Sequence, residues 1–419
     1  MATVIWRGDA DAVAQISTAT PASVEISDVF TLTCGGSSVS FTATAATVAD
    51  VTAGITTAWN ASTAPEMAEI TATDSTTTVT LTHDTAGVEF TVTATEVDGG
   101  GTDDQTFTMA TPTAAAGPHV WSTDSNWSTG SVPADDDHII IEESDVDILY
   151  GLGQSGITAD SLTIKASYTG EIGLEETNSD GTTSYTEYRD TFLEIEPDKI
   201  DIGAGDGNGS AMIKINTGSV ATAVTVMKTA SATETNCGAV QWKGTNAGNT
   251  LTVQRGDVGV ATQGGETATI ATLAVSYSTS VSNDASVVCG SGVTLTTINQ
   301  FGSTLEINSA AVTCNVSAGT LTVNGTSTIT TATVEGGTLY HQSSGTITTL
   351  VVSASGTIDF SRDAKTRTVI NTSVYTGAAI RDPHKTVTWT NGIDGVHCDP
   401  MNEAILQLGK NYTVTPSAI

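Results

Sequence analysis

The chain has 419 residues, of which 38% are hydrophobic and 5% aromatic, and its formal net charge is −32. Residues 1–120 hold 14 acids and one base, and residues 121–200 hold 18 acids and three bases. Binding a polyanion needs a basic surface, so this charge excludes nucleic acid as a partner of the N-terminal half. Thr, Ser, Ala, Val and 41 Gly dominate the composition, which favours pleated sheets and frequent turns.

The sequence shows no targeting or redox signature. Its first residues lack a charged stretch followed by an apolar one, so we expect no secretory signal and synthesis in a cytoplasm. No apolar run approaches the roughly 20 residues of a membrane-spanning helix, so we expect no membrane partner. The cysteines are widely spaced and lack metal-binding spacing, and we expect small, buried, reduced residues: Cys34, Cys237, Cys289, Cys314 and Cys398.

Residues 1–110 are expected to form a small α+β domain. Phe30 and Leu32 alternate with Thr, and after a Gly-rich turn Val39 and Phe41 alternate with polar residues. This pattern predicts a hairpin. Two Thr-rich strands, around residues 79–81 and 90–92, are predicted further on as a second hairpin with a turn at residues 85–87. Residues 111–118 contain Pro and Gly without charge, which predicts a linker.

One amphipathic helix is predicted between these strands. Thr47 stands at the N-cap position with Asp50 three residues later, a variant of the capping box. Apolar residues then recur at steps of three and four, giving one face that can cover a sheet: Val48, Val51, Ile55, Ala58 and Trp59. Asn60 is a plausible end of the helix. The next candidate helix is residues 403–408.

A degenerate repeat in the second half predicts the main architecture. Gly302, Gly319, Gly337 and Gly356 are spaced by 17, 18 and 19 residues. Apolar residues follow each glycine at the same phase, and two further apolar tracks follow within the repeats: Leu305, Leu321, Leu339 and Ile358; then Ile307, Val323, His341 and Phe360; then Ile329 and Ile347; then Val334 and Val352. Each repeat thus carries about three short strands.

A unit this short cannot bury its own apolar face, but stacked units can. We therefore expect a mainly β protein in which the small α+β domain precedes a parallel β-helix over residues 119–395, with an irregular first half and a C-terminal cap or tail at 396–419. A β-sandwich array is the alternative, and it would show longer strands joined by antiparallel turns.

Several acidic groups are candidate sites. Glu171, Glu175 and Glu176, or Glu194, Glu196 and Asp198, offer carboxylate pairs of the kind that cleave glycosidic bonds. With 46 acids, accidental pairs are expected. The Gly-rich acidic run from Asp201 to Ser210 offers oxygen ligands for calcium but lacks the spacing of an EF-hand, so a β-helix corner is the simpler interpretation.

The remaining polar groups give no catalytic pattern. The six histidines do not cluster, and His341 replaces an apolar residue on an inward track, which favours a core or corner position. A basic group near the last coils can either face solvent or dock against an acidic neighbour: Arg362, Lys365, Arg367, Arg381 and Lys385. We therefore predict no catalytic residue, no cofactor-binding residue and no metal ligand.

Two segments resemble known modules. Residues 26–45, the helix ending at Asn60 and residues 79–93 resemble a small module of tailed-bacteriophage structural proteins, similar to insertion domains of tail-sheath and related virion proteins. The Trp-rich run from Trp121 to Pro133, followed by Asp137 and residues 139–141, resembles the opening of β-helical passenger and fibre domains. The chain departs from secreted passengers in lacking a signal sequence. Neither resemblance supplies a functional residue.

Together the resemblances imply a virion structural protein, a capsid decoration or a head or tail fibre, located on the particle and acting through protein–protein attachment. The implied partners are other virion proteins of capsid or tail, further copies of the chain in a trimer, and a host surface glycan. Two alternatives remain open at this point: a tailspike-like glycan depolymerase and a bacterial surface adhesin.

Overall fold

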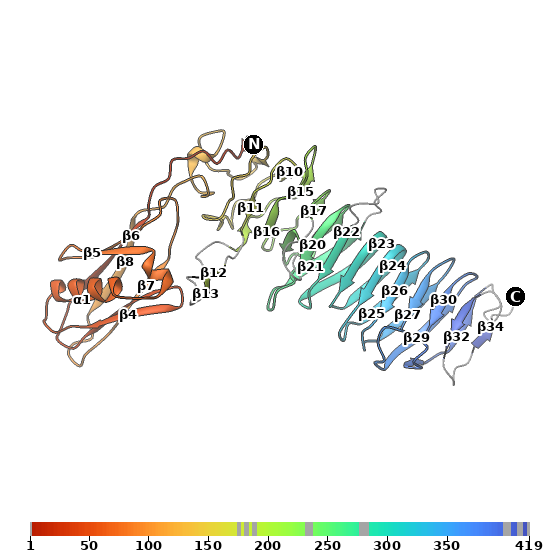
Figure 1. Cartoon of the computed structure of the whole chain (residues 1–419). Helices are drawn as coiled ribbons and strands as arrows, with labels where there is room; N and C mark the ends of the chain where they lie inside the picture. Colours follow the sequence, from red (N-terminus) through yellow and green to blue (C-terminus); the bar gives the residue numbers. More distant parts are fainter. Residues whose placement is uncertain are drawn as a thin grey trace.

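The computed structural model describes residues 2–173, 177–179, 184–186, 191–230, 238–275, 285–396, 404–408 and 414–416. A long stack of parallel strands forms a rod, and a smaller domain with one long helix lies beyond its N-terminal end (Figure 1). The prediction of a mainly β, parallel solenoid is confirmed.

Each coil of the solenoid contributes two hydrogen-bonded strands, which form two parallel stacks. The first stack contains β1 (Thr3–Ile5), β9 (His138–Ile141), β10 (Ser161–Lys165), β15 (Lys199–Ala204), β17 (Ala223–Val226), β19 (Thr250–Val253), β21 (Ala268–Val275), the first halves of β23 (Val293–Ile307) and β24 (Ala311–Val323), β25 (Ile329–Val334), β27 (Ile347–Val352), β29 (Arg367–Val374), β31 (Val387–Trp389), β32 (Ile393–Gly395) and β34 (Val414–Pro416).

The second stack contains β11 (Glu171–Ile172), β14 (Leu193–Glu194), β16 (Met212–Asn216), β18 (Val240–Lys243), β20 (Gly256–Val260), β22 (Ala285–Cys289), the second halves of β23 and β24, β26 (Thr338–His341), β28 (Thr357–Asp359), β30 (Ala379–Arg381) and β33 (Ile405–Gln407). Outside both stacks, β12 (Thr177–Ser179) pairs with β13 (Ser184–Thr186) in an antiparallel hairpin.

The core of the solenoid consists of side chains stacked coil on coil. Leu305 pairs in register with Leu321, Leu321 with Leu339, and Leu339 with Ile358, and all four are fully buried. The neighbouring ladder runs through Ile307, Val323 and His341. Every inward position predicted from the glycine repeat is therefore confirmed, because a parallel in-register stack keeps the phase set by the corner glycines.

A corner inside the first-stack strands produces the third apolar track. In β25, Ile329 and Ala332 both face the core, and the two residues between them face outward, which breaks the strand alternation. β27 repeats this pattern with Ile347 and Leu350. Each coil consequently has three sides: side one before the corner, side two after it, and side three in the second stack.

The repeat glycines stand where consecutive coils come closest. A Cβ on Gly356 would lie 2.1 Å from the carbonyl oxygen of Val334, and one on Gly319 would lie 2.4 Å from the carbonyl carbon of Gly302. Gly319 also has a φ of +78°, which side chains disfavour. The spacing of the repeat is thus set by backbone contact between coils.

Replacing Gly356 with alanine is expected to lower the free energy of unfolding by about 1–3 kcal/mol, since the added methyl group must push two coils apart. Urea unfolding followed by circular dichroism measures this change. Gly264→Ala is the matched control, because nothing lies within 4 Å of that position. Equal effects of the two substitutions would contradict the coil-contact explanation.

The N-terminal strand belongs to the solenoid, which corrects the expected domain boundary at residues 1–110. In β1, Val4 pairs with Ile139 of β9, and the α+β domain is inserted between these two strands. The entering and leaving segments are joined to each other by a hydrogen bond from Val13 N–H to the oxygen of Ala116 at 2.7 Å. The inserted domain is therefore tethered at both ends.

Three tryptophans close the N-terminal end of the solenoid core. Trp6, Trp121 and Trp127 are each at most 2% exposed. The ring centroids of Trp121 and Trp127 lie 4.6 Å apart in an edge-to-face arrangement, and Trp6 lies 5.1 Å from Trp127. The Nε1 of Trp127 donates a hydrogen bond to the oxygen of Trp121 at 2.8 Å. The short 3₁₀ helix η1 (Asp124–Asn126) turns the chain between Trp121 and Trp127.

The inserted domain contains two antiparallel sheets and the predicted helix. One sheet has the order β5-β6-β2-β8 and the other β4-β3-β7. Their bounds are β2 (Ile16–Ala22), β3 (Val29–Cys34), β4 (Ser37–Thr42), β5 (Ile70–Asp74), β6 (Val79–His83), β7 (Val92–Val97) and β8 (Thr106–Thr113). α1 (Val48–Asn60) packs on both sheets, and the short α2 (Pro65–Ala68) follows it.

α1 begins and ends where predicted. Thr47 caps it, since its Oγ1 accepts a hydrogen bond from Asp50 N–H at 3.3 Å. In a capping box the Asp50 carboxylate would accept a hydrogen bond from the N–H group of Thr47. Here it accepts hydrogen bonds from the N–H groups of Thr44 and Ala45 instead. On the inner face, Trp59 is buried and its Nε1 donates to the oxygen of Ile70 at 2.8 Å.

Three local predictions need correction. The later Thr-rich strands do not form a hairpin: β6 pairs with β2 and β5, whereas β7 pairs with β3 in the other sheet. The expected linker at 111–118 begins inside β8, because a strand can end in Pro where no ladder bond is needed. Finally, β33 is a strand, whereas the sequence offers residues 403–408 as a candidate helix, and β33 extends the solenoid beyond residue 395.

The described cysteines are buried and unbonded, as expected: Cys34, Cys289 and Cys314. Burial raises the pKa of the Cys289 and Cys314 thiols to about 12, so both remain protonated in the core. Cys237 and Cys398 lie outside the described residues.

Candidate functional site

The structure separates the two acidic groups proposed for glycoside cleavage from each other, whereas within the second group Glu194 and Glu196 flank the buried Ile195 and Asp198 is exposed. Glu171 of β11 lies opposite Met212, and Glu194 of β14 lies opposite Asn216, both on β16. Four residues of extended chain put the two backbone positions about 13 Å apart. Glycosidases hold their two carboxyl groups roughly 5–10 Å apart, so Glu171 and Glu194 do not form such a pair across the two groups. Glu175 and Glu176 lie outside the described residues.

A cluster on side three surrounds Glu194. The Nζ of Lys243 lies 3.7 Å from the centre of the Phe192 ring and 3.7 Å from Oε1 of Glu266. Lys214 faces the same ring at 5.9 Å, and the Nδ2 of Asn216 donates to Glu194 at 3.4 Å. Sequence reasoning missed this cluster, since its members come from different coils and meet only through the coil register.

The Gly-rich acidic run after Asp201 is a packed corner of the solenoid. Asp201 itself lies in β15, and its carboxylate pairs with Lys199 at 2.6 Å. Lys228 donates to the oxygen of Gly207, and a Cβ on Gly207 would lie 2.2 Å from the oxygen of Ala166. Among the described residues, no group of three or more His, Cys, Asp or Glu side chains is placed to hold a metal ion.

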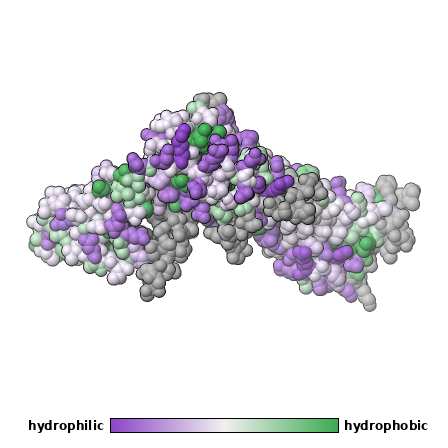
Figure 2. Space-filling model, turned by 45° about the horizontal axis from the view of Figure 1, so that its top comes forward, coloured by the Kyte–Doolittle hydropathy of each residue, from purple (hydrophilic) through white to green (hydrophobic). Residues whose placement is uncertain are grey.

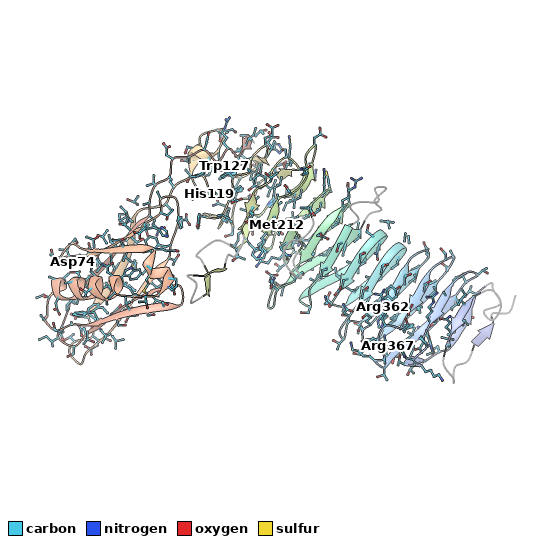
Figure 3. All side chains as sticks on the ribbon, in the orientation of Figure 1. Asp74, His119, Trp127, Met212, Arg362 and Arg367 are labelled. Carbon is cyan, nitrogen blue, oxygen red and sulfur yellow. The ribbon has the colours of Figure 1, made fainter. Side chains whose placement is uncertain are left out.

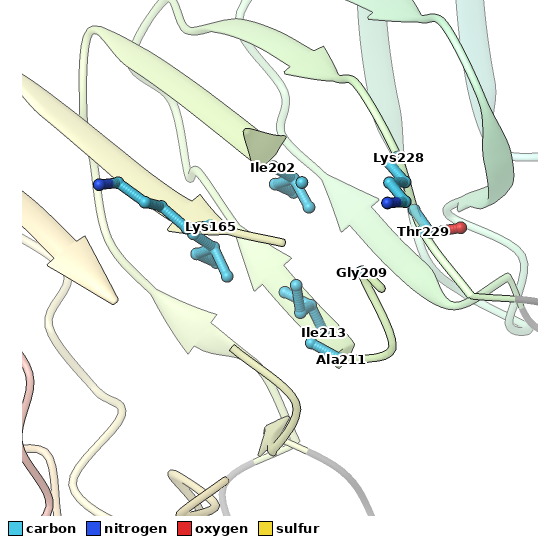
Figure 4. Close-up of a pocket in the computed structure, with 9 residues that line it drawn as sticks. Lys165, Ile202, Gly209, Ala211, Ile213, Lys228 and Thr229 are labelled. Carbon is cyan, nitrogen blue, oxygen red and sulfur yellow. The ribbon is translucent and has the colours of Figure 1, made fainter. Parts of the chain in front are cut away.

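A small pocket lies beside this corner (Figure 4). Its volume is about 10 Å³, which is room for at most one water molecule. Its lining is Ile164, Lys165, Ile202, Gly203, Gly209, Ala211, Ile213, Lys228 and Thr229. The pocket is a packing gap between coils and is too small for a substrate.

The described histidines lie apart from one another. His83, His119 and His384 each contact backbone oxygens through a ring nitrogen, and His138 contacts Asp160 at 3.0 Å. His341 is 1% exposed on the inward ladder, as predicted. Neither of its ring nitrogens has a hydrogen-bond partner. His397 lies outside the described residues.

The basic group divides into a surface part and a buried part. Arg362, Lys365, Arg381 and Lys385 are exposed, whereas Arg367 is 3% exposed. The Arg367 guanidinium donates to the oxygens of Asp363, Lys365 and His341, and it therefore holds the corner 361–366 in shape. Figure 3 shows Arg362 and Arg367 near the C-terminal coils, and His119 and Trp127 near the junction with the inserted domain.

Carboxylates lie beside much of the surface part. Lys365 pairs with Asp363 at 2.8 Å, and Arg381 lies 3.8 Å from Asp359. Arg362 lies over the ring of Tyr340, with 3.3 Å between the guanidinium carbon and the ring centre. Two of the four exposed bases, Lys365 and Arg381, are therefore paired with carboxylates.

The described part of the chain contains no helix long and apolar enough to span a bilayer. Comparison with known proteins finds no matching family model, no matching curated protein and no matching solved structure.

Proposed function

We propose that this chain is a structural attachment protein of a bacteriophage particle, either a capsid decoration or a head or tail fibre. The inserted α+β domain binds other virion proteins of the capsid or tail, and the solenoid projects from it as a rigid rod. The function is binding through complementary surfaces, and no reaction is assigned to it. Copies of the chain assemble into a trimer, and a host surface glycan is a further partner.

The observation that carries this proposal is the double connection between the rod and the inserted domain. Two chain segments join them, and these segments are bridged to each other at Val13 and Ala116. At the same joint Val88 of the domain packs against Val120, Leu149 and Tyr150 of the solenoid. A single flexible linker would let the domain swing, whereas two bridged segments fix its direction, which suits an anchor at the base of a rod.

The resemblance of the inserted domain to tail-sheath insertion modules and of residues 121–141 to fibre domains supports the choice of a phage particle. The charge also supports it. A protein with a net charge of −32 is repelled by nucleic acid and by its own copies except where its surface is neutral, so it stays soluble at high copy number until it finds its partner surface.

The test is mass spectrometry of particles purified from lysates of cells that express the gene, with an antibody against the inserted domain to locate the chain by electron microscopy. We expect the protein in intact particles at a fixed copy number. Its absence from particles and presence in the bacterial envelope would support the adhesin instead. Release of oligosaccharides from host capsule by the purified chain would support the depolymerase.

A further inference from the structure

A surface without any charge runs along the rod where side one meets side two. In six successive coils, from β21 to β29, four residues per coil face outward around the corner. We name these 24 residues the threonine corner: residues 269, 271, 272 and 274; 294, 296, 297 and 299; 310, 312, 313 and 315; 328, 330, 331 and 333; 346, 348, 349 and 351; and 368, 370, 371 and 373.

The composition of the threonine corner differs from the rest of the surface. It contains 14 Thr, three Asn, one Ser and six apolar residues, and no Asp, Glu, Lys or Arg. Side three of the same coils presents Glu306 and Arg381 at outward positions among further threonines, and Asp359 is buried beside Arg381. Figure 2 shows strongly hydrophilic side chains gathered over the first coils and again near the last ones. The threonine corner itself therefore carries no charge, whereas other outward positions of the rod carry some.

The coil register makes the corner regular. Thr272, Thr297, Thr313, Thr331 and Thr349 pair one above the other in an unbroken column on side two. Parallel strands place such side chains about 4.8 Å apart. In the adjacent column, the amide of Asn315 donates to the amide oxygen of Asn299 at 2.9 Å, so this polar pair is satisfied along the rod.

Two large apolar side chains are exposed at or beside this surface. Val312 lies in the corner and Phe301 lies just beyond its side-two edge, and each is 49% exposed. The corner spans five steps of about 4.8 Å along the rod and four side chains across it, so its area is on the order of 600 Å². In a ring of three, each copy buries this area against two neighbours, about 300 Å² against each, so a single contact is smaller than the roughly 800 Å² per partner of a standard stable interface and the three contacts must act together.

We propose that the threonine corner is the surface through which copies of this chain pack against each other. Two copies that each carry a net charge of −32 repel one another over most of their surface, and this repulsion is absent at the corner. Because two sides diverge from one edge, each copy can offer one side to each of two neighbours. That arrangement closes into a ring, and we expect a ring of three with the corner at its axis.

The inference rests on the trimer of the proposed function, for which it names the contact surface, and its test needs no particles. Light scattering of the purified full-length chain is expected to give three times the chain mass of 42.7 kDa. The double substitution Thr331→Lys and Thr349→Lys puts two charges in the corner and should reduce the measured mass threefold. A monomeric corner variant that still enters particles would leave the attachment role intact.

The matched control carries the same change on side three. Thr320 and Thr338 are half-buried outward residues of the same region, paired in register between β24 and β26. The Thr320→Lys and Thr338→Lys variant should keep the mass of the wild type. If the double corner variant fails to fold, the single substitution Thr331→Glu gives the same readout. A monomeric wild type, or equal masses for the corner and side-three variants, would overturn the proposal.

Discussion

Replacing Trp121 with alanine is expected to lower the free energy of unfolding by about 3–5 kcal/mol, the usual cost of removing a fully buried large aromatic side chain. Trp121 is 0% exposed and packs edge-to-face on Trp127, with Trp6 stacked 6.4 Å away. A stack of coils has no further coil to cover its first one, and the three rings cover the core at this N-terminal end. The cavity left by alanine would therefore admit water to the first coil.

The effect should be local as well as large. Trp6 directly follows β1, and β1 is held to the solenoid by its pairing with β9 and by hydrogen bonds between Ile5 and Ser128, the residue after Trp127. We expect hydrogen exchange in β1 and β9 to accelerate strongly in Trp121→Ala, while β25 to β29 keep their protection, because coils of a solenoid interact mainly with their neighbours. Urea unfolding gives the free energy, and exchange by mass spectrometry locates the change.

Two further variants make the result specific. Trp121→Phe keeps most of the ring and removes an indole N–H that has no hydrogen-bond partner, so its cost should be much smaller. Trp389→Ala removes a half-buried tryptophan at the other end of the rod and should leave the exchange of β1 unchanged. Uniform acceleration across all coils in Trp121→Ala would contradict the view that the tryptophans cap one end.

The regular coils could be predicted from sequence because the backbone contacts between them require glycine at fixed positions in each repeat. Close approach between coils demands a glycine, so Gly319, Gly337 and Gly356 record the spacing, and the apolar residue two positions after each glycine records the phase. In the first half of the solenoid the chain leaves the stack after Ile172 and resumes it at Leu193, and this insertion hides the repeat.

Some features could not be predicted from the sequence because they depend on pairing between residues far apart in the chain. β1 is three residues long, and its partner lies more than 130 residues away, so no local pattern could assign it to the solenoid. The side-three cluster and the threonine corner have the same origin. Phe192 meets Lys243, and Thr313 meets Thr331, only when the length of each coil is known. The sequence shows which residue types occur in the side-three cluster and the threonine corner, but only the strand register shows which of these residues are neighbours.

Replacing His341 with leucine is expected to remove part of the acid sensitivity of the fold. His341 sits in the inward ladder between Val323 and the Phe360 ring, 5.8 Å from the latter. Burial, assisted by the nearby Arg367 guanidinium, lowers the pKa of His341 from 6.5 to about 3. Leucine fits a position whose ladder neighbours are apolar, and it also removes two ring nitrogens without hydrogen-bond partners.

The sign of the pH effect follows from proton binding. Between pH 6.5 and about 3 the unfolded chain protonates this histidine and the folded chain does not, so acid favours the unfolded state. The wild type should therefore lose about 1.4 kcal/mol per pH unit relative to His341→Leu across this window. Above pH 7 both states are neutral, and the difference between the two proteins should be constant.

Urea unfolding of both proteins at pH 7.5, 6, 5 and 4 measures the divergence, and subtraction of the two curves cancels the contribution of the many carboxylates that they share. His384→Leu serves as the control because His384 is exposed near the last coils, so its substitution should leave the wild-type pH dependence in place. Parallel stability curves for the wild type and His341→Leu down to pH 4 would show that the folded chain accommodates the proton, and they would refute a neutral, buried His341.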